Sequence, residues 1–379
     1  MKSLHMLDHV LIIGGGVVGL TTAWELARRD RKVCIVEAGT FGQGATAAAG
    51  GMLGLTAEVH FGEGDLLAFQ KKNVEIYEEY VNQLQTASDT DVDYRNQPTL
   101  VVARDRDDEE ALQRVVDYQT GVGLRAHWLG ADEIKARHPS LRNVVRAVAC
   151  PDDHRLDPAA LARALIVACR RRGVKMMEDS AVLRVMSDER GLRGVVLEDG
   201  RRIYANQIIV AAGARSATIE GIPELSGPVV RPVRGQIIVV DGGEQPPIDT
   251  VIRSPDVYLV PRRDGRIFIG STMEEKGFSR EVTVGAVRTL LEEAWTIVPD
   301  LDERPIIELR CGFRPVSLDG RPILGPSQLS GLFLACGHGR HGILLAPMTG
   351  RIMARYLCGE QEGDPEFEAF TPRRFATTP

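Results

Sequence analysis

The sequence predicts an α/β protein (α+β overall), in which a doubly wound parallel-sheet domain is discontinuous in sequence and surrounds an inserted antiparallel-sheet domain. Short apolar runs that lead into glycine-rich turns occur near both ends of the chain, at 9–13 and 332–336. Such runs are typical of strands buried on both faces of a parallel sheet. Between about 229 and 272 the expected strands instead follow one another closely through turns such as Asp264-Gly265, which favours antiparallel pairing.

The chain is long enough for two domains. It has 379 residues, of which 44% are hydrophobic and 26% charged, as in globular proteins. We expect the first domain to comprise residues 1–95, 142–226 and 313–379, and the second to comprise 96–141 and 227–312. The remaining expected elements are helices at about 65–84, 107–118, 158–172, 284–297 and 343–357, and strands at 99–103, 174–185, 194–197 and 208–212.

Composition argues against several classes of protein. The net charge of -6 argues against a broad nucleic-acid-binding face. No uninterrupted apolar run of about 18 residues is present, so we expect no integral membrane segment. The 6 cysteines lack CxxC spacing, which argues against a zinc ribbon or a disulfide framework and favours a reducing, cytoplasmic compartment. We therefore expect no metal site.

The first 37 residues form a complete β-α-β unit of the Rossmann type. Gly14, Gly16 and Gly19 make a G-x-G-x-x-G turn between a strand at 9–13 and a helix at 20–29, and a second strand ends at Glu37. The glycines permit the tight turn, the approach of backbone to a pyrophosphate and close helix packing. Glu37 is placed to accept hydrogen bonds from ribose hydroxyls, so a dinucleotide without a 2′-phosphate is expected.

Two features favour FAD over NAD. A stretch of small residues continues from 42 to 54, beyond the point where an NAD domain would begin its next helix. The chain also returns late to glycine-rich turns, at 211–213 and 337–342. The helix that begins near Ile343 is expected to direct its positive end toward the N1–C2 region of the flavin.

Several segments resemble the D-amino-acid oxidase superfamily, and within it the bacterial glycine oxidases associated with thiazole synthesis for thiamine. The resemblance extends from about His9 to Leu357. It is carried by Glu37-Ala-Gly-Thr40, Ala47-Ala-Ala-Gly-Gly-Met-Leu-Gly54, Tyr258-Leu-Val-Pro-Arg262, Gly270-Ser-Thr-Met273, Gly312-Phe-Arg-Pro315, Asp319-Gly-Arg-Pro322 and Gly337-His-Gly-Arg-His-Gly-Ile-Leu-Leu-Ala-Pro347.

The resemblance implies a set of cofactor-binding residues distributed over the whole chain. FAD would be held by Gly14, Gly16, Val17, Val18, Gly19, Glu37, Ala38, Thr46, Ala47, Gly51, Met52, Val182, Ala212, Gly213, Arg314, His338, Gly339, Arg340, His341, Gly342, Ile343 and Leu344.

The resemblance also implies a catalytic site. Arg314 would bind the substrate carboxylate, Tyr258 would support it, Met52 and Met273 would line a small pocket, and Arg340 would lie near the flavin and the substrate. The implied reaction is hydride transfer from the α-carbon of glycine, a small D-amino acid or sarcosine to the flavin. Reoxidation by O2 would give H2O2, and the imine would hydrolyse to glyoxylate or another 2-oxo acid and ammonia.

Alternatives remain open. Asp256 and Thr56 stand where the glycine oxidases have histidines, so D-amino acids larger than glycine remain possible substrates. The chain could instead be a D-amino-acid dehydrogenase that passes electrons to quinone, a sarcosine- or proline-type secondary amine oxidase subunit, or a flavin-binding scaffold without turnover. A homo-oligomer is another open alternative. Cys311 lies near the position at which related sarcosine oxidases attach flavin, but its neighbours do not resemble that local pattern.

Overall fold

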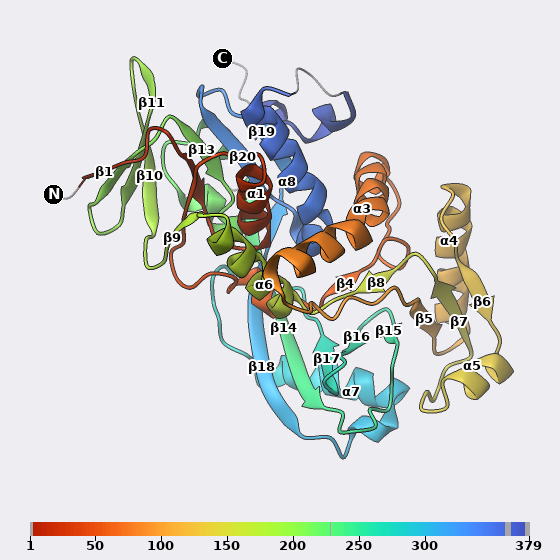
Figure 1. Cartoon of the computed structure of the whole chain (residues 1–379). Helices are drawn as coiled ribbons and strands as arrows, with labels where there is room; N and C mark the ends of the chain where they lie inside the picture. Colours follow the sequence, from red (N-terminus) through yellow and green to blue (C-terminus); the bar gives the residue numbers. More distant parts are fainter. Residues whose placement is uncertain (1–2, 228, 361–364, 376–379) are drawn as a thin grey trace.

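The computed structural model describes residues 3–227, 229–360 and 365–375, and it divides into two regions, each built on a large sheet (Figure 1). The sheet in the first region has six strands. In spatial order they are β19 (Ile323–Pro326), β20 (Leu332–Cys336), β13 (Gln207–Val210), β2 (Val10–Ile13), β3 (Val33–Val36) and β9 (Lys175–Met177). All neighbours are parallel except β19, which runs antiparallel to β20. Every residue of β2 and β3 is buried, as their continuous apolar sequence predicts.

Helices cover one face of this sheet (Figure 1). They are α1 (Val17–Ala27), α3 (Gly64–Ser88), α6 (Pro158–Arg171) and α8 (Gly342–Cys358). Their shared core contains the fully buried rings of Trp24, Tyr77 and Tyr80. Helix α6 begins where the sequence predicts, because Asp157 accepts hydrogen bonds from the N–H groups of Ala159 (2.8 Å) and Ala160 (3.2 Å).

A second sheet, not helices, covers the opposite face, so the expectation of a doubly wound domain was wrong. This sheet has the order β1 (Ser3–His5), β12 (Arg202–Tyr204), β11 (Gly191–Leu197) and β10 (Val182–Asp188). Leu11 and Ile13 of β2 pack in one cluster with Val195 and Ile203. Residues 182–204 form antiparallel strands joined by tight turns, and no stretch between them is long enough to form a covering helix.

The second region is an eight-stranded sheet. Its order is β18 (Ile306–Ser317), β14 (Val230–Asp241), β17 (Arg266–Gly270), β16 (Tyr258–Pro261), β15 (Val251–Arg253), β5 (Thr99–Ala103), β7 (Arg146–Cys150) and β6 (His127–Leu129). The pairing is antiparallel, as predicted, except that β15 and β5 are parallel. We expected the second domain to end at residue 141 and again at residue 312. The sheet extends beyond both positions, because β7 begins after residue 142 and β18 runs across residue 313. The division into domains stays a prediction.

Shorter elements complete the fold. Helices α4 (Arg106–Gly121), α5 (Ala131–Arg137) and α7 (Val284–Ile297) flank the eight-stranded sheet, while α2 (Ala45–Ala48), β4 (Met52–Leu53) and β8 (His154–Arg155) lie near the junction of the two regions. Short 3-10 helices occupy Gly213–Thr218, Pro223–Leu225, Pro299–Leu301, Gly339–His341, Pro365–Phe370 and Pro372–Phe375. Across the described part of the chain, no helix combines the length and apolar character needed to cross a bilayer.

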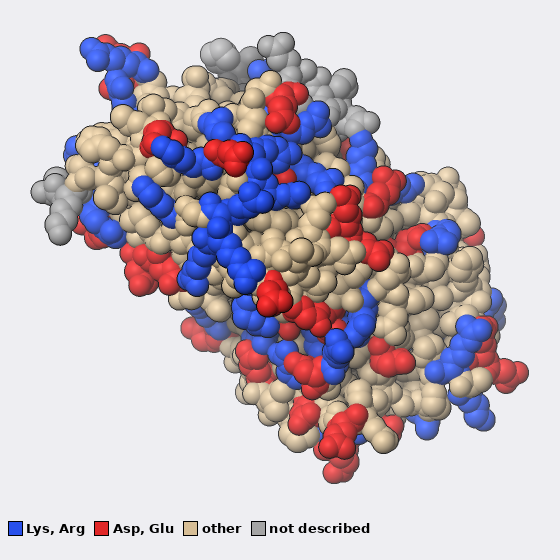
Figure 2. Space-filling model, in the orientation of Figure 1, with Lys and Arg blue, Asp and Glu red and all other residues tan. Residues whose placement is uncertain are grey.

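Charged side chains of both signs are interspersed over the face shown in Figure 2, with basic residues gathered over α1 and α6. This face therefore does not carry a uniform charge of one sign.

Candidate functional site

A large cavity extends between the six-stranded and the eight-stranded sheet. Its volume is about 1550 Å³, and its walls come from the glycine-rich turn after β2, the small-residue segment 43–52, strands β14, β16 and β18, and the turn before α8. Pockets for small ligands usually measure roughly 300–1,000 Å³. This cavity can therefore hold a dinucleotide together with a small second molecule.

The glycines after β2 differ in why they are needed. A Cβ on Gly14, where φ is +106°, would lie 2.4 Å from the carbonyl oxygen of Ala211, and one on Gly19 would lie 2.0 Å from that of Gly14. Both are therefore required by packing. A Cβ on Gly16 would meet only Thr46 Oγ1, at 3.5 Å, and would project where the cavity lies. The lack of a side chain at Gly16 therefore enlarges the cavity and is not required by packing within the protein.

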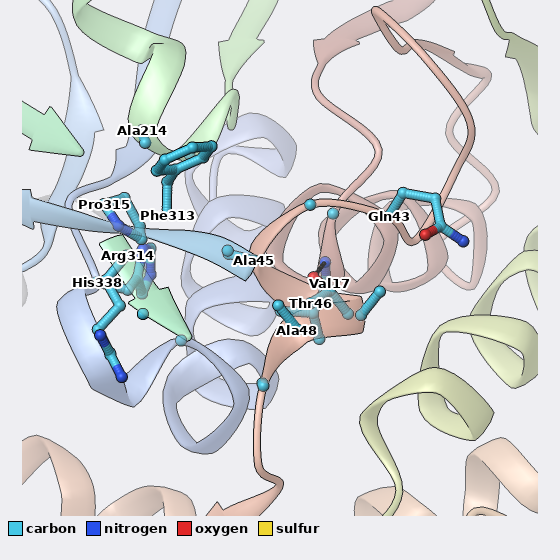
Figure 3. A pocket seen from close by; sticks show the side chains of 18 of the residues that line it. Val17, Gln43, Ala45, Thr46, Ala48, Ala214, Phe313, Arg314, Pro315 and His338 are labelled. Carbon is cyan, nitrogen blue, oxygen red and sulfur yellow. Dashed lines mark hydrogen bonds between the residues drawn. The ribbon is translucent and has the colours of Figure 1, made fainter. Parts of the chain in front are cut away.

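Two side chains fix the segments around this turn. The carboxylate of Glu37 accepts hydrogen bonds from the N–H groups of Gly15 (2.7 Å) and Gly39 (3.0 Å). Thr46 Oγ1 accepts the N–H of Val17, the first residue of α1, at 3.0 Å. Figure 3 shows Val17 and Thr46 on one side of the pocket, and Arg314 and His338 on the other.

Most of the predicted site residues line this one cavity. They are Gly14, Gly16, Val17, Val18, Glu37, Ala38, Thr46, Ala47, Gly51, Met52, Val182, Ala212, Gly213, Tyr258, Met273, Arg314, His338, Gly339, Arg340, Gly342 and Ile343.

Three predicted cofactor residues do not line it. Gly19 packs against the backbone of Gly14, and Leu344 is buried within the helical core. His341 is 4% exposed and its Nε2 has no hydrogen-bond partner among the described residues. These three residues therefore lie behind the surface of the cavity. A side chain on a turn or helix points in one direction only, so one that faces the core cannot also face the cavity.

Arg314 lies on β18 and crosses the neighbouring strand. Its Nη1 donates to the carbonyl oxygen of Thr272 at 3.0 Å, and its Nη2 donates to Ser271 Oγ. Both acceptors follow β17, on the far side of β14. The crossing point is Gly235, where a Cβ would lie 2.6 Å from Arg314 Nη1.

Tyr258 begins β16, and its ring fits between two glycines. A Cβ on Gly270 would lie 2.6 Å from its hydroxyl oxygen, and one on Gly50 would lie 2.9 Å from it. Burial raises the pKa of Tyr258, although the nearby charge of Arg314 acts in the opposite direction. The phenol therefore stays protonated at neutral pH and can donate a hydrogen bond.

Arg253, Glu58 and His60 line the cavity and were missed by the sequence analysis, whereas Arg340, which also lines it, was predicted. Arg253 lies directly across the β15–β16 pair from Tyr258 and binds Glu58 Oε1 at 3.1 Å. Arg340 donates to Glu63 Oε1 and to the carbonyl oxygen of Glu58, both at 3.0 Å. His60 also lines the cavity, and burial and the charge of Arg340 lower its pKa. The register of the β15–β16 hairpin is the signal that could have identified Arg253.

Two arginines, the half-buried Arg310 and the buried Arg262, hold the small-residue segment by its carbonyl oxygens. Arg310 Nη1 donates to the carbonyl oxygen of Ala47 at 2.8 Å, and Arg262 Nη2 donates to that of Gly50. Both guanidinium groups lie beside the ring of Phe268, at 4.9 and 4.5 Å from its centroid. Burial lowers the pKa of Arg262 to about 10, so it remains charged at neutral pH. Arg262 does not line the cavity.

Met52 and Met273 differ in exposure, and so do Asp256 and Thr56, the residues at the two positions where glycine oxidases have histidines. Met52 is half-buried, whereas Met273 is 70% exposed and lies at the opening. Asp256 lines the cavity and accepts a hydrogen bond from Arg104 at 2.9 Å. Thr56 is fully buried and lies outside the cavity wall, where its N–H binds Asp153. Only Asp256 can therefore influence a bound substrate directly.

The other candidates that the sequence raised also have definite positions. The described residues contain no group of three or more His, Cys, Asp or Glu side chains suited to a metal ion. Burial lowers the pKa of His338 to about 3, and Nε2 of this residue hydrogen-bonds Thr349 Oγ1 at 3.1 Å. Cys311 lines the cavity, and burial raises the pKa of its thiol, which disfavours the nucleophilic thiolate.

Comparisons with known proteins identify a family and several relatives of this chain. A model of the family described as FAD dependent oxidoreductase (DAO) matches residues 9–356. The chain is 32% identical to the glycine oxidase of Geobacillus kaustophilus (strain HTA426), over 92% of each chain. The crystal structure of glycine oxidase from Geobacillus kaustophilus superposes with a TM-score of 0.88 and 30% identity, covering 96% of this chain and 97% of that one. The crystal structure of iminodiacetate oxidase from Chelativorans sp. BNC1 gives a TM-score of 0.85 and 28% identity, covering 96% of this chain and 99% of that one.

Proposed function

Because the chain belongs to the DAO family of FAD-dependent oxidoreductases and is of the glycine oxidase type, we propose that it oxidatively deaminates glycine, small D-amino acids and small secondary amines such as sarcosine. The observation that carries this proposal is the position of Arg314. Its guanidinium lines the cavity next to Tyr258, on the wall opposite the glycine-rich turn.

The residues of the cavity fit FAD. Gly16 leaves open space at the start of α1, where backbone N–H groups and the helix dipole favour a pyrophosphate. Glu37 lies at the end of β3, where it can receive ribose hydroxyls. His338, Gly339, Arg340, Gly342 and Ile343 would contact the ring system from the other side. When bound, FAD supplies an acceptor for a hydride from the α-carbon and returns the electrons to O2 as H2O2.

The protein's own residues bind and orient the substrate. A guanidinium has five N–H donors, and Arg314 uses two of them for Thr272 and Ser271. The others can hold a carboxylate, and the protonated phenol of Tyr258 can donate to the same group. Fixing the carboxylate fixes which α-hydrogen points toward the flavin, so a chiral substrate reacts in one enantiomer only.

The charged wall formed by Arg253, Glu58 and Arg340 favours small or polar substrates. Large apolar side chains would remove these ion pairs from water without replacing the lost hydrogen bonds. An N-substituted glycine with a second carboxylate is a second candidate, because Arg340 and Arg253 lie beside the proposed carboxylate site. The similarity to an iminodiacetate oxidase supports this candidate.

The proposal is tested by anaerobic mixing of the holoprotein with glycine, sarcosine, D-alanine, D-proline, iminodiacetate and L-alanine while the flavin absorbance is followed. Glycine, sarcosine or D-alanine should bleach the flavin, and L-alanine should not. Failure of all the amines to bleach it would contradict the proposal. Formation of H2O2 in air would distinguish an oxidase from a dehydrogenase that uses quinone.

Other aspects of the function stay predictions. The imine product is expected to hydrolyse to glyoxylate or another 2-oxo acid and ammonia. A role in thiamine biosynthesis follows only from the resemblance to glycine oxidases. A cytoplasmic location rests on the unpaired cysteines, all 6 of which are free thiols in the structure.

A further inference from the structure

The segment 271–283, which we name the clamp loop, connects β17 to α7 and supplies both acceptors that hold Arg314. Its first residues continue along the edge of β14 beyond β17. The N–H of Thr272 donates to the carbonyl oxygen of Gln236 (3.4 Å), and Glu274 and Arg234 exchange backbone hydrogen bonds at 2.8 and 3.0 Å. The clamp loop is therefore an extension of the sheet where it meets Arg314.

Side chains of β14 hold the clamp loop at several points. Arg234 Nη2 donates to Glu274 Oε2 at 2.5 Å, and Arg234 Nη1 donates to Ser279 Oγ (3.0 Å) and to the carbonyl oxygen of Glu281 (3.2 Å). Glu274 Oε1 accepts hydrogen bonds from Thr272 Oγ1 (2.7 Å) and from Gln236 Nε2 (2.6 Å). One ion pair thus connects the start of the loop to its end.

Arg234 and Arg314 act on opposite faces of the same strand. Side chains alternate along a strand, so Arg234 and Gln236 point away from the face on which Gly235 lies. Arg314 crosses that face at Gly235 to reach Ser271 and Thr272. The backbone of 271–274 is therefore held from one face by Arg314 and from the other by Arg234 and Gln236.

We propose that Arg234 and Glu274 are positioning residues for the carboxylate clamp, and that they orient Arg314 by fixing the two clamp-loop acceptors that its guanidinium binds. This inference rests on the proposed function, since it assumes that Arg314 binds the substrate carboxylate. It predicts that the ion pair controls affinity for the carboxylate and not the rate of the chemical step.

The surroundings of the pair support this role. Arg234 is 3% exposed, and neither Arg234 nor Glu274 lines the cavity, so they act through the loop and not by contact with a ligand. The hydrogen bond from Arg234 lowers the pKa of Glu274 to about 2, so the ion pair persists throughout the working pH range. Loss of Glu274 would leave the buried guanidinium of Arg234 without its charged partner, which is costly.

The chain provides a matched control. Arg231 lies on the same strand and binds Glu275, the next residue of the clamp loop, at 3.1 Å. This pair is open to solvent, since the side chains are 37% and 70% exposed. Arg231→Met removes an arginine–glutamate pair between the same two segments without touching the acceptors of Arg314.

The test compares Arg234→Met, Glu274→Gln, Arg234→Lys and Arg231→Met holoproteins. Steady-state kcat and KM for glycine, FAD content, and the Kd for acetate measured through the flavin spectrum are the readouts. We expect Arg234→Met and Glu274→Gln to raise KM for glycine and Kd for acetate roughly ten- to a hundredfold with kcat and FAD content near normal. Arg234→Lys should recover part of the loss, and Arg231→Met should behave like the wild type.

A double variant adds a readout that a general structural defect would not change. If Arg234 acts through Arg314, Arg234→Met should have little further effect on acetate binding in an Arg314→Met background. Additive effects would overturn the inference, as would a wild-type Kd and KM in Glu274→Gln or a parallel loss of kcat and FAD. If Arg234→Met does not fold, Glu274→Gln and Arg234→Lys provide the same comparison. A wild-type holoprotein that binds no acetate and oxidises no amine would instead refute the proposed function, and the inference with it.

Discussion

The guanidinium of Arg314 crosses strand β14 at Gly235, the position on that strand where the lack of a side chain lets it reach Ser271 and Thr272. Arg314 lies on β18, and the acceptors that hold it lie on the other side of β14, in the segment that follows β17. Gly235 therefore shapes the proposed substrate site, although it has no side chain of its own.

Gly235→Ala should therefore weaken substrate binding while the protein stays folded. The new Cβ would lie 2.6 Å from Arg314 Nη1, and the flexible guanidinium would move in preference to the strand. Loss of one charge-assisted hydrogen bond costs about 1.5–3 kcal/mol, so KM for glycine should rise roughly 10- to 150-fold. Thermal unfolding should change little. Gly285→Ala is the control, because no atom lies within 4 Å of its Cβ position. A wild-type KM in Gly235→Ala would contradict the crossing geometry.

Gly16 and Gly19 should respond differently to alanine. In Gly19→Ala the Cβ would meet the carbonyl oxygen of Gly14 at 2.0 Å, so the protein without FAD should lose about 1–3 kcal/mol of unfolding free energy. In Gly16→Ala the nearest contact is 3.5 Å, so the apoprotein should keep its stability but retain much less FAD. Urea unfolding of both apoproteins and the FAD content of purified protein measure these effects. Normal FAD content in Gly16→Ala would remove Gly16 from the cofactor site.

The pH dependence of kcat/KM should show no step from the buried histidines. Burial lowers the pKa of His338 to about 3 and that of His341 well below its ordinary value. A histidine with a lowered pKa is neutral at every pH above that value, so His338 stays neutral between pH 5 and 9, and His341 is neutral at neutral pH. Because hydride loss requires a neutral amine, kcat/KM should instead rise with pH toward the pKa of the substrate amine. An inflection near the ordinary histidine pKa of about 6.5 would point to a titrating protein group.

Substrate preference should depend on the charged wall next to Tyr258. We expect kcat/KM for D-leucine to be at least about tenfold below that for D-alanine, because an apolar side chain would desolvate the Arg253–Glu58 pair. Replacing both charges, in Arg253→Met with Glu58→Leu, should narrow this ratio, since apolar replacement of a whole pair is often tolerated. The exposed pair Arg106–Glu110, replaced in the same way, is the control. If the variant with Arg253→Met and Glu58→Leu keeps the wild-type ratio of kcat/KM between D-alanine and D-leucine, the charged wall is not the source of selectivity.

Local patterns were sufficient to predict the glycine-rich half of the cavity. The glycine turn, Glu37 and strands β2, β3, β13 and β20 each follow from fewer than twenty consecutive residues, because a buried strand and a tight turn have short sequence signatures. The four-stranded sheet on the second face was not foreseen. Its strands were visible in the sequence, but the surface against which they would pack was not.

The contacts that hold the proposed catalytic residues in place depend on strand register and could not be predicted. In the run Glu274-Glu275-Lys276 nothing in the sequence separates the two glutamates, which suggest a solvated turn. The pairing of the clamp loop with β14 is what distinguishes them. It brings the side chain of Glu274 into contact with Arg234, where Glu274 is 24% exposed, and it leaves the side chain of Glu275 70% exposed. The parallel pairing of β15 with β5 likewise joins segments about 150 residues apart, a separation at which periodicity carries no information.

The central claim is that Arg314 holds the substrate carboxylate, and Arg314→Met tests it most directly. Removing one partner of a buried charge pair costs roughly 3–5 kcal/mol, which lowers kcat/KM for glycine by about two to three and a half orders of magnitude. Most of the loss should appear in KM, because the carboxylate keeps its charge through the reaction. Arg314→Lys should recover only part of it, since an ammonium lacks the two parallel donors. We predict this result with near-normal FAD content, whereas an FAD-loaded Arg314→Met protein with wild-type kcat/KM for glycine would contradict the account and direct attention to Arg340 or Arg253.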